Sequence, residues 1–219
     1  MFSLHALLDA LPYLIKAAQA TVLISLVGLV IGFVVAIAVC SARLSKNRFV
    51  SKLGGAYVGF FRGVPLLVQL LFIYYFLAEF GIDVPAMAAA IGGLGFASGA
   101  YQAEILRGAL NATPPGQAEA AKAFGFSRAE IWRRILLPQA LRISVPPFIN
   151  EFTLLLKASS LVSVVGIAEL TRVSMNIASS TYRPLEAYLG AGLFYLAINL
   201  CIAGLGNLAE RRLAAGVAR

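Results

Sequence analysis

The sequence predicts an all-α, polytopic membrane protein that crosses the bilayer about five times. Of its 219 residues, 60% are hydrophobic and only 13% are charged, and the mean hydropathy is +0.84. Water-soluble domains are about 45–50% apolar and about 25% charged. Windows with few or no charges recur along the chain, and each provides the roughly 20 helical residues that cross a bilayer core. We therefore expect one transmembrane domain over residues 1–219.

Five spans are expected, in chain order 17–42, 53–78, 84–110, 139–165 and 187–209. The first and last are free or nearly free of charge, and the third is free of charge up to residue 103. The second includes Arg62, and the fourth includes Glu151 and Lys157. Because no basic region precedes a short apolar run at the N-terminus, we interpret the first span as a retained helix.

The basic residues predict the orientation. The loop after the first span carries four basic residues, and the loop between the third and fourth spans carries five, counted to Arg142, so both are expected in the cytoplasm. The N-terminus is then outside and the C-terminus is cytoplasmic. The net charge of the chain is +8. Its lysines and arginines alternate by loop and do not form one basic stripe, which argues against nucleic acid as a partner.

The loop at 113–138 has its own predicted structure. Thr113-Pro-Pro-Gly116 ends the third span because proline cannot continue a helix, and a proline near the next helix start is tolerated. Residues 117–124 favour a short helix, and Gly125 suits its C-terminal stop. Ser127-Arg-Ala-Glu130 fits a capping box that opens a second short helix. The sequence thus predicts helix, glycine turn, helix.

Charges within membrane spans cost roughly 2.5–3.5 kcal/mol each on insertion scales, so they persist where they pair or line a wet path. Arg62 precedes Gly63 and Pro65, which interrupt the second span. It could meet a substrate carboxylate or extend to the cytoplasmic interface. Glu104 and Arg107, three residues apart, could line the path or simply pair with each other.

The fourth span carries a predicted polar half-cylinder. Asn150 and Lys157 share one helical face at a spacing of seven, and Glu151 and Ala158 share the neighbouring face. These residues could form a substrate path or act as interhelical polar contacts. Lys157 or Arg62 together with Glu151 would place one positive and one negative charge within the bundle.

The loop at 113–138 contains Glu119-Ala120-Ala121, then Gly125 after three residues, and Leu137-Pro138 further on. This pattern resembles the cytoplasmic signature loop of ABC-importer permeases. Over roughly residues 10–212 the chain is similar to the polar amino acid permeases, of the histidine, glutamine, arginine and cystine type. The segments that carry this similarity are 61–69, which ends in Gln69, then 101–108, 137–142, 150–157 and 159–161, which includes Ser160.

The resemblance implies a type I ABC-importer permease fold and an import system in the bacterial cytoplasmic (inner) membrane. Its partners would be two ATPase subunits, a second permease subunit that is identical or related, an external solute-binding protein, the amino acid and the lipid bilayer. Glu119, Ala120, Ala121, Gly125 and Pro138 would belong to the coupling segment, and Gln69 and Ser160 to the substrate path. The chain has no phosphate-binding Gly-x-x-x-x-Gly-Lys-Ser/Thr loop, so ATP and Mg would be bound by the partner ATPase and no cofactor by this chain.

The resemblance also bears on the substrate and on assembly. Many relatives have an acidic residue where this chain has Ala158, so its absence argues weakly against a basic amino acid. A dimer is expected, because five helices can hardly enclose a hydrophilic path alone. Glycines such as Gly28 and Gly32 could allow close packing either between chains or within one.

Two rival functions belong to other classes. A subunit of an ATP-independent secondary amino acid transporter or channel would use the intramembrane charges as a coupling-ion site, but it leaves the signature loop unexplained. A membrane enzyme is disfavoured because His5 is the only histidine and no nucleophile sits beside a plausible base.

Overall fold

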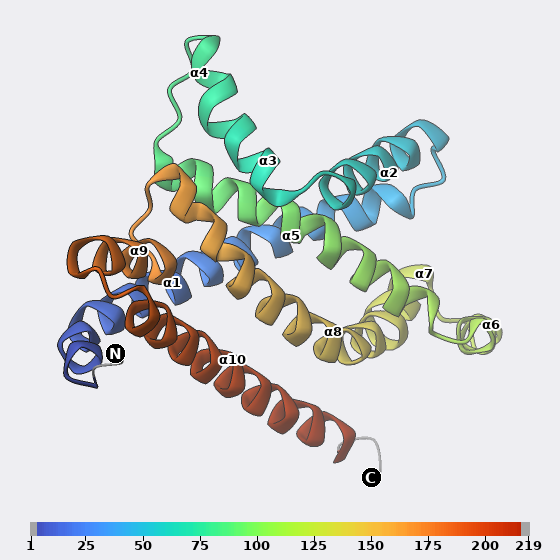
Figure 1. The fold of residues 1–219 in the computed structure, drawn as a ribbon. Coiled ribbons are helices and arrows are strands. Elements are labelled where there is room, and N and C mark those ends of the chain that lie inside the picture. The colour runs from blue at the N-terminus through green and yellow to red at the C-terminus, as the bar shows by residue number, and fades with distance from the viewer. Residues whose placement is uncertain (1–3, 216–219) are drawn as a thin grey trace.

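The computed structural model describes residues 4–215, which form helices joined by short connections, with no β-strand in this part of the chain (Figure 1). The longest helices are α1, α5, α8 and α10, and the shorter ones lie at the two ends of the bundle. The elements in order are α1 (Leu4–Arg43), α2 (Arg48–Gly63), α3 (Leu66–Leu71), the π-helical η1 (Phe72–Phe76), α4 (Leu77–Glu79), α5 (Ala86–Asn111), α6 (Pro115–Ala123), α7 (Arg128–Ile131), the π-helical η2 (Trp132–Leu136), α8 (Leu137–Ala158), the 3₁₀ segment η3 (Ser159–Val165), α9 (Leu170–Thr181) and α10 (Pro184–Ala215).

Three helical stretches of the described chain have the length and hydropathy to cross a bilayer, at Leu7–Arg43, Arg128–Val165 and Pro184–Arg212. The bent pair Arg48–Gly63 and Leu66–Glu79 would add a fourth. Helix α5, where we expected a span at 84–110, is not among them. Its glycines and polar residues lower its hydropathy, and this is tolerated because α1 and α8 cover much of its surface. The count of five spans stays a prediction.

The expected span at 53–78 is not one straight helix. Helices α2 and α3 meet at 105°, with Val64 and Pro65 in extended conformations between them. The side chain of Gln69 stabilises this break, since its Nε2 donates to the carbonyl oxygens of Phe61 (3.0 Å) and Val64 (2.7 Å). These carbonyls at the end of α2 would otherwise lack intrahelical partners.

Helices α1 and α5 pack backbone against backbone along a stripe of four glycines, here called the glycine seam (Gly28, Gly32, Gly95 and Gly99). A Cβ atom on Gly32 would lie 3.0 Å from the carbonyl oxygen of Gly95 and 3.1 Å from the amide nitrogen of Gly99. A Cβ on Gly99 would lie 2.9 Å from Val35 Cγ1. These glycines therefore serve close packing within one chain.

The largest buried cluster joins the seam to the rest of the bundle. Its members are apolar side chains from α1, α3, α5, α8 and the η3 region, among them Ile24, Leu70, Leu94, Leu155 and Val162. Figure 1 shows the turn between α1 and α2, the α6–α7 segment and the end of α10 on one side of the molecule, and the N-terminal end of α1, α4 and α9 on the other. The basic loops identified in the sequence thus lie on one side.

Candidate functional site

The first candidate site is the α6–α7 segment at one end of the bundle (Figure 1). Helix α6 ends in a Schellman motif, in which the amide of Gly125 donates to Lys122 O (2.9 Å) and that of Phe126 to Ala121 O (3.0 Å). Gly125 has φ = +83°, a left-handed conformation that side chains with a Cβ rarely adopt. The predicted glycine stop is confirmed.

Helix α7 begins with the predicted capping box. Ser127 Oγ accepts from the amide of Glu130 (3.3 Å), and Glu130 Oε2 accepts from the amide (3.0 Å) and hydroxyl (2.8 Å) of Ser127. Hydrogen bonds from the Ser127 backbone and side chain lower the pKa of Glu130, and Arg134 adds a smaller effect. The two short helices are therefore fixed at a defined angle by the turn between them.

The predicted coupling residues divide into outward and inward positions. Glu119, Ala120, Gly125 and Pro138 are exposed, whereas Ala121 is buried. Phe124 is 83% exposed at the turn. Further exposed side chains on the segment are Lys122, Phe126, Arg128, Trp132, Arg133 and Arg134. The segment thus presents small, aromatic and basic side chains on one projecting surface.

The second candidate site is a cavity of about 490 Å³ where the α2–α3 break meets α5 and α8. Arg62, Glu151 and Ala158 line it, together with Ser98, Tyr101 and the backbone around Pro65. The guanidinium of Arg62 lies 5.2 Å from the centre of the Tyr101 ring, which is a cation–π distance. Glu151 is only 6% exposed, and Ser98 donates to its Oε1 at 2.8 Å.

An adjoining cavity of about 310 Å³ shares Arg62, Tyr101 and Glu151 with the first. Asn150 and Glu104 also line it. Five of the predicted path residues, namely Arg62, Glu104, Asn150, Glu151 and Ala158, are therefore brought to two neighbouring cavities. We refer to the two together as the central cavity.

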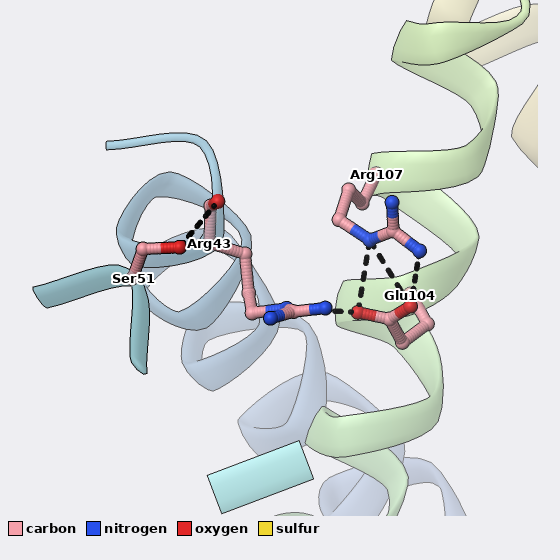
Figure 2. A network of polar contacts seen from close by, with 4 residues as sticks. All are labelled: Arg43, Ser51, Glu104 and Arg107. Atoms are coloured by element: carbon pink, nitrogen blue, oxygen red, sulfur yellow. Dashed lines mark hydrogen bonds and ion pairs between the residues drawn. The ribbon is translucent and has the colours of Figure 1, made fainter. Parts of the chain in front are cut away.

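Glu104 is held by two arginines (Figure 2). Arg107 binds its carboxylate through Nε (3.0 Å to each oxygen) and Nη2 (2.6 Å to Oε2). Arg43, at the end of α1, reaches Oε1 at 3.4 Å, and its carbonyl accepts from Ser51 Oγ at 3.2 Å. The predicted Glu104–Arg107 pair is present. The network also ties α5 to the turn between α1 and α2.

Three of the predicted path residues lie elsewhere. Lys157 is exposed and lines a separate cavity of about 410 Å³ with Thr153, Tyr195 and Asn199, so it does not share a cavity with Glu151. Ser160 donates to Lys157 O (2.8 Å). Gln69 holds the α2–α3 break, as described above.

The sequence reasoning did not single out Ser98, Tyr101 or Gln102 individually. Their spacing of three to four residues on α5 forms a polar stripe in an otherwise small and apolar helix, and this stripe was the available signal. Arg43 was counted only as a loop charge, because its contact with Glu104 spans 61 residues of sequence. In the described part of the chain, no group of three or more His, Cys, Asp or Glu side chains is placed to hold a metal ion.

Arg62 and Glu151 line one cavity between the helices, and the α6–α7 segment lies at one end of the bundle. The long apolar helices define the class of the chain as a membrane protein. Residues 28–215 match the family described as "Binding-protein-dependent transport system inner membrane component". The chain belongs to this family, and it is a permease subunit of an ABC importer. ATP hydrolysis in these systems belongs to a separate subunit.

Two relatives of similar sequence are permeases of the same kind. The chain is 39% identical to the nopaline transport system permease protein of Agrobacterium fabrum, covering 94% of this chain and 90% of the relative. It is 36% identical to the glutamine transport system permease protein of Escherichia coli, covering 97% and 98%.

Solved structures agree on the fold. An amino acid ABC transporter crystallised with histidines matches with a TM-score of 0.92 and 35% identity, covering 97% of this chain and 99% of the other. An inward-facing methionine ABC transporter matches with a TM-score of 0.77 and 22% identity, covering 94% and 98%, and supports the fold alone. The type I ABC-importer permease fold expected from the sequence is confirmed.

Proposed function

We propose that this chain moves a polar amino acid inward across the cytoplasmic membrane by alternating access, with the α6–α7 segment as the contact through which an ATPase drives the change. The single observation that carries this proposal is the rigid helix, Schellman turn and capped helix at 115–131, which projects at the end of the bundle. A flexible loop could not transmit a displacement, whereas two short helices fixed by a turn can. The ATP-independent alternative gives this segment no role.

The coupling surface is assigned to the outward-facing residues of this segment. Glu119 and Ala120 on α6 and the exposed ring of Phe124 would enter a groove on the ATPase. Ala121 and Gly125 would act indirectly, Ala121 by packing inward and Gly125 by fixing the turn. Pro138, in the first turn of α8, would set where the segment joins the bundle. ATP and Mg would be bound by the ATPase.

The substrate class follows from the central cavity. Its larger part, about 490 Å³, falls in the range of roughly 300–1,000 Å³ for small-molecule sites. Arg62 can offer a planar, bidentate site to a carboxylate, and Glu151 can accept from an α-ammonium group. The relatives are named for nopaline, octopine and glutamine transport, and a structural neighbour is an amino acid ABC transporter.

The assembly we propose contains two copies of an ATPase, a second permease subunit that is identical or related, and an external solute-binding protein. The N-terminus would be outside and the C-terminus cytoplasmic. Two observations support this orientation: the basic loops and the α6–α7 segment lie on one side of the bundle (Figure 1), and cytoplasmic loops carry the excess of lysine and arginine.

The first experiment is affinity purification of the tagged permease from native membranes, followed by mass spectrometry. The wild-type protein should retain a stoichiometric ATPase. Gly125→Val should lose it, because a β-branched residue is strongly disfavoured at φ = +83° and the turn would open. Gly125→Asn should retain most of it, since asparagine tolerates the left-handed region.

Gly116→Val provides the matched control. Gly116 lies in the same short segment, has no positive φ, and has nothing within 4 Å of the position that a Cβ would take. It should keep the ATPase. A wild-type preparation without any ATPase would overturn the proposal and return attention to the ion-coupled alternative.

Substrate class is tested by uptake into proteoliposomes that contain the purified complex and its binding protein. The panel is radiolabelled L-glutamine, L-glutamate, L-histidine and L-arginine, with ATP inside. Ala158→Asp adds a carboxylate to the lining of the cavity, so it should shift competition toward arginine. Unchanged competition by arginine would remove Ala158 from the specificity determinants.

A further inference from the structure

A chain of buried hydrogen bonds runs from α1 through α5 to the carboxylate of Glu151. Gln102 Nε2 donates to the carbonyl oxygen of Leu29 on α1 (3.1 Å) and to Ser98 Oγ (2.9 Å). Ser98 Oγ donates to Glu151 Oε1 on α8 (2.8 Å). Ser98 and Gln102 are each 1% exposed. The chain therefore connects three helices through two side chains that are almost completely buried.

The direction of every hydrogen bond in this chain is determined. A backbone carbonyl only accepts, so the amide group of Gln102, and not its oxygen, must face Leu29. Its second N–H then points at Ser98. An ionised carboxylate only accepts, so the proton of the Ser98 hydroxyl is directed at Glu151. Oε1 of Glu151 is thus held as an acceptor, while Oε2 has no hydrogen-bond partner among the described residues.

The position of Gln102 is itself restricted by the glycine seam. A Cβ on Gly32 would lie only 2.7 Å from Gln102 Nε2, so the amide group occupies the space that this glycine leaves open. Ser98 and Glu151 also both line the central cavity, so the chain ends where a solute would bind.

We propose that Ser98 and Gln102 are positioning residues for substrate: they orient the Glu151 carboxylate so that its second oxygen accepts from the ammonium group of an amino acid in the central cavity. The inference rests on the function proposed above, since it requires that the cavity binds an amino acid. It adds that affinity for the ammonium group depends on residues of α5 and on their contact with α1, through a hydroxyl group that is hydrogen-bonded to Glu151.

The test is direct binding of the amino acid to the purified permease–ATPase complex without the solute-binding protein, measured by scintillation proximity. The probe is whichever radiolabelled amino acid of the panel the wild type transports, together with its analogue lacking the α-amino group, for example glutaramate for glutamine. Ser98→Ala should weaken binding of the amino acid about tenfold and leave binding of the analogue within twofold. Ser98→Thr, which keeps the hydroxyl, should restore at least part of the affinity.

The matched control is Ser144→Ala. Ser144 is also a fully buried serine, but its hydroxyl donates to Ala140 O in its own helix (2.7 Å). It should bind both probes as the wild type does, and thermal unfolding should show that all the variants are folded. In a Glu151→Gln background, Ser98→Ala should add no further loss, since the group that it positions has been changed.

The outcomes separate the two levels of the proposal. If Glu151→Gln weakens binding and Ser98→Ala does not, the positioning role is overturned while the cavity stands. If Ser98→Ala weakens both probes equally, the serine has a general packing role and the inference is again overturned. If Glu151→Gln has no effect on binding, or the wild-type complex binds no probe, the assignment of the cavity fails and the inference fails with it.

Discussion

Glycine has opposite roles in the two regions that define this molecule. In the glycine seam between α1 and α5, Gly32 and Gly99 have ordinary helical conformations, and what matters is the space that they leave for the neighbouring backbone. At the α6–α7 turn, Gly125 has nothing within 4 Å of a Cβ position, and what matters is its φ of +83°. The same residue type is required for volume in one region and for backbone conformation in the other.

This difference teaches which substitutions each region tolerates. Adding one carbon to the seam forces two helices apart, whatever its conformational preference. Adding one at the turn meets no atom but strains the backbone, and asparagine should therefore be accepted there but not in the seam. The seam packs α1 against α5, the helix that carries Ser98 and Tyr101 of the central cavity, and the turn fixes the shape of the surface proposed to meet an ATPase.

The largest effect is expected from Gly32→Ala in the seam. The added Cβ would lie 3.0 Å or less from Gly95 O and Gln102 Nε2, and overpacking of this kind costs about 1–3 kcal/mol. The unfolding temperature of the purified protein in detergent should fall by several degrees. Gly204→Ala on α10, which meets nothing within 4 Å, is the control, and equal unfolding temperatures for the two variants would contradict the packing role of the seam.

A smaller loss is expected from Glu104→Gln, which breaks the network that joins the end of the seam to the α1–α2 turn (Figure 2). The glutamate side chain is 17% exposed and its two arginine partners are about a third exposed. We therefore expect a cost of about 1–2 kcal/mol, between the values for exposed and buried ion pairs.

The comparison for this prediction is Arg134→Gln on the α6–α7 segment. Its pair with Glu130 is longer, at 3.8 Å, and the two side chains are 66% and 43% exposed. The unfolding temperature of Arg134→Gln should be close to that of the wild type. A Glu104→Gln variant as stable as Arg134→Gln would show that the network in Figure 2 contributes nothing measurable.

Ser127→Ala should have a local effect on the α6–α7 segment, about 1 kcal/mol on the helix that it caps. It should also raise the pKa of Glu130 part of the way toward its ordinary value, because the hydroxyl hydrogen bond is lost while the larger contribution, from the Ser127 backbone amide, remains. With a lowered pKa in the folded state, the contribution of the Glu130 carboxylate is complete above the unfolded pKa and is lost as the pH falls through the folded pKa. Carbon-13 NMR titration of labelled glutamate measures the shift, and Ser127→Thr should preserve it.

The smallest effect is expected from Gly108→Ala, and its sign should be opposite to that of Gly32→Ala. Gly108 is a helical glycine on α5, beyond the seam, and has nothing within 4 Å of a Cβ position. Replacing an unconstrained helical glycine by alanine stabilises a helix by roughly 0.5–1 kcal/mol. A slight rise in the unfolding temperature supports the comparison, whereas a fall as large as that of Gly32→Ala would show that glycine position on α5 does not decide the outcome.

Local features of the fold were predictable because their causes are local. The glycine stop at Gly125 and the capping box from Ser127 to Glu130 depend on hydrogen bonds within a few residues, and both are present as expected. The Glu104–Arg107 pair was also foreseeable, since residues three apart share a helical face. The contact of Arg43 with the same carboxylate was not, because nothing in the sequence states which helices lie side by side.

The polar half-cylinder on α8 shows where sequence reasoning stops. Asn150 and Lys157 are seven residues apart, yet Asn150 lines the central cavity and Lys157 lines a cavity against α10. Spacing along a helix shows which residues share a face. It does not show which neighbouring helix packs against that face at each turn. Gln69 was likewise expected to line the substrate path. Its amide group instead donates hydrogen bonds to the carbonyl oxygens at the 105° break.

The sequence by itself determined that this is a helical membrane protein, where its helix–turn–helix segment lies, and which residues shape that segment, because hydropathy, proline and glycine positions and capping act over short distances. The tertiary structure alone decided that α2 and α3 form a sharp corner, that Arg62 and Glu151 share a cavity without Lys157, and that Ser98 and Gln102 stand behind Glu151. These depend on how helices distant in sequence pack together. Backbone contact along the glycine seam helps to set that packing, and only the folded structure shows which glycines face each other.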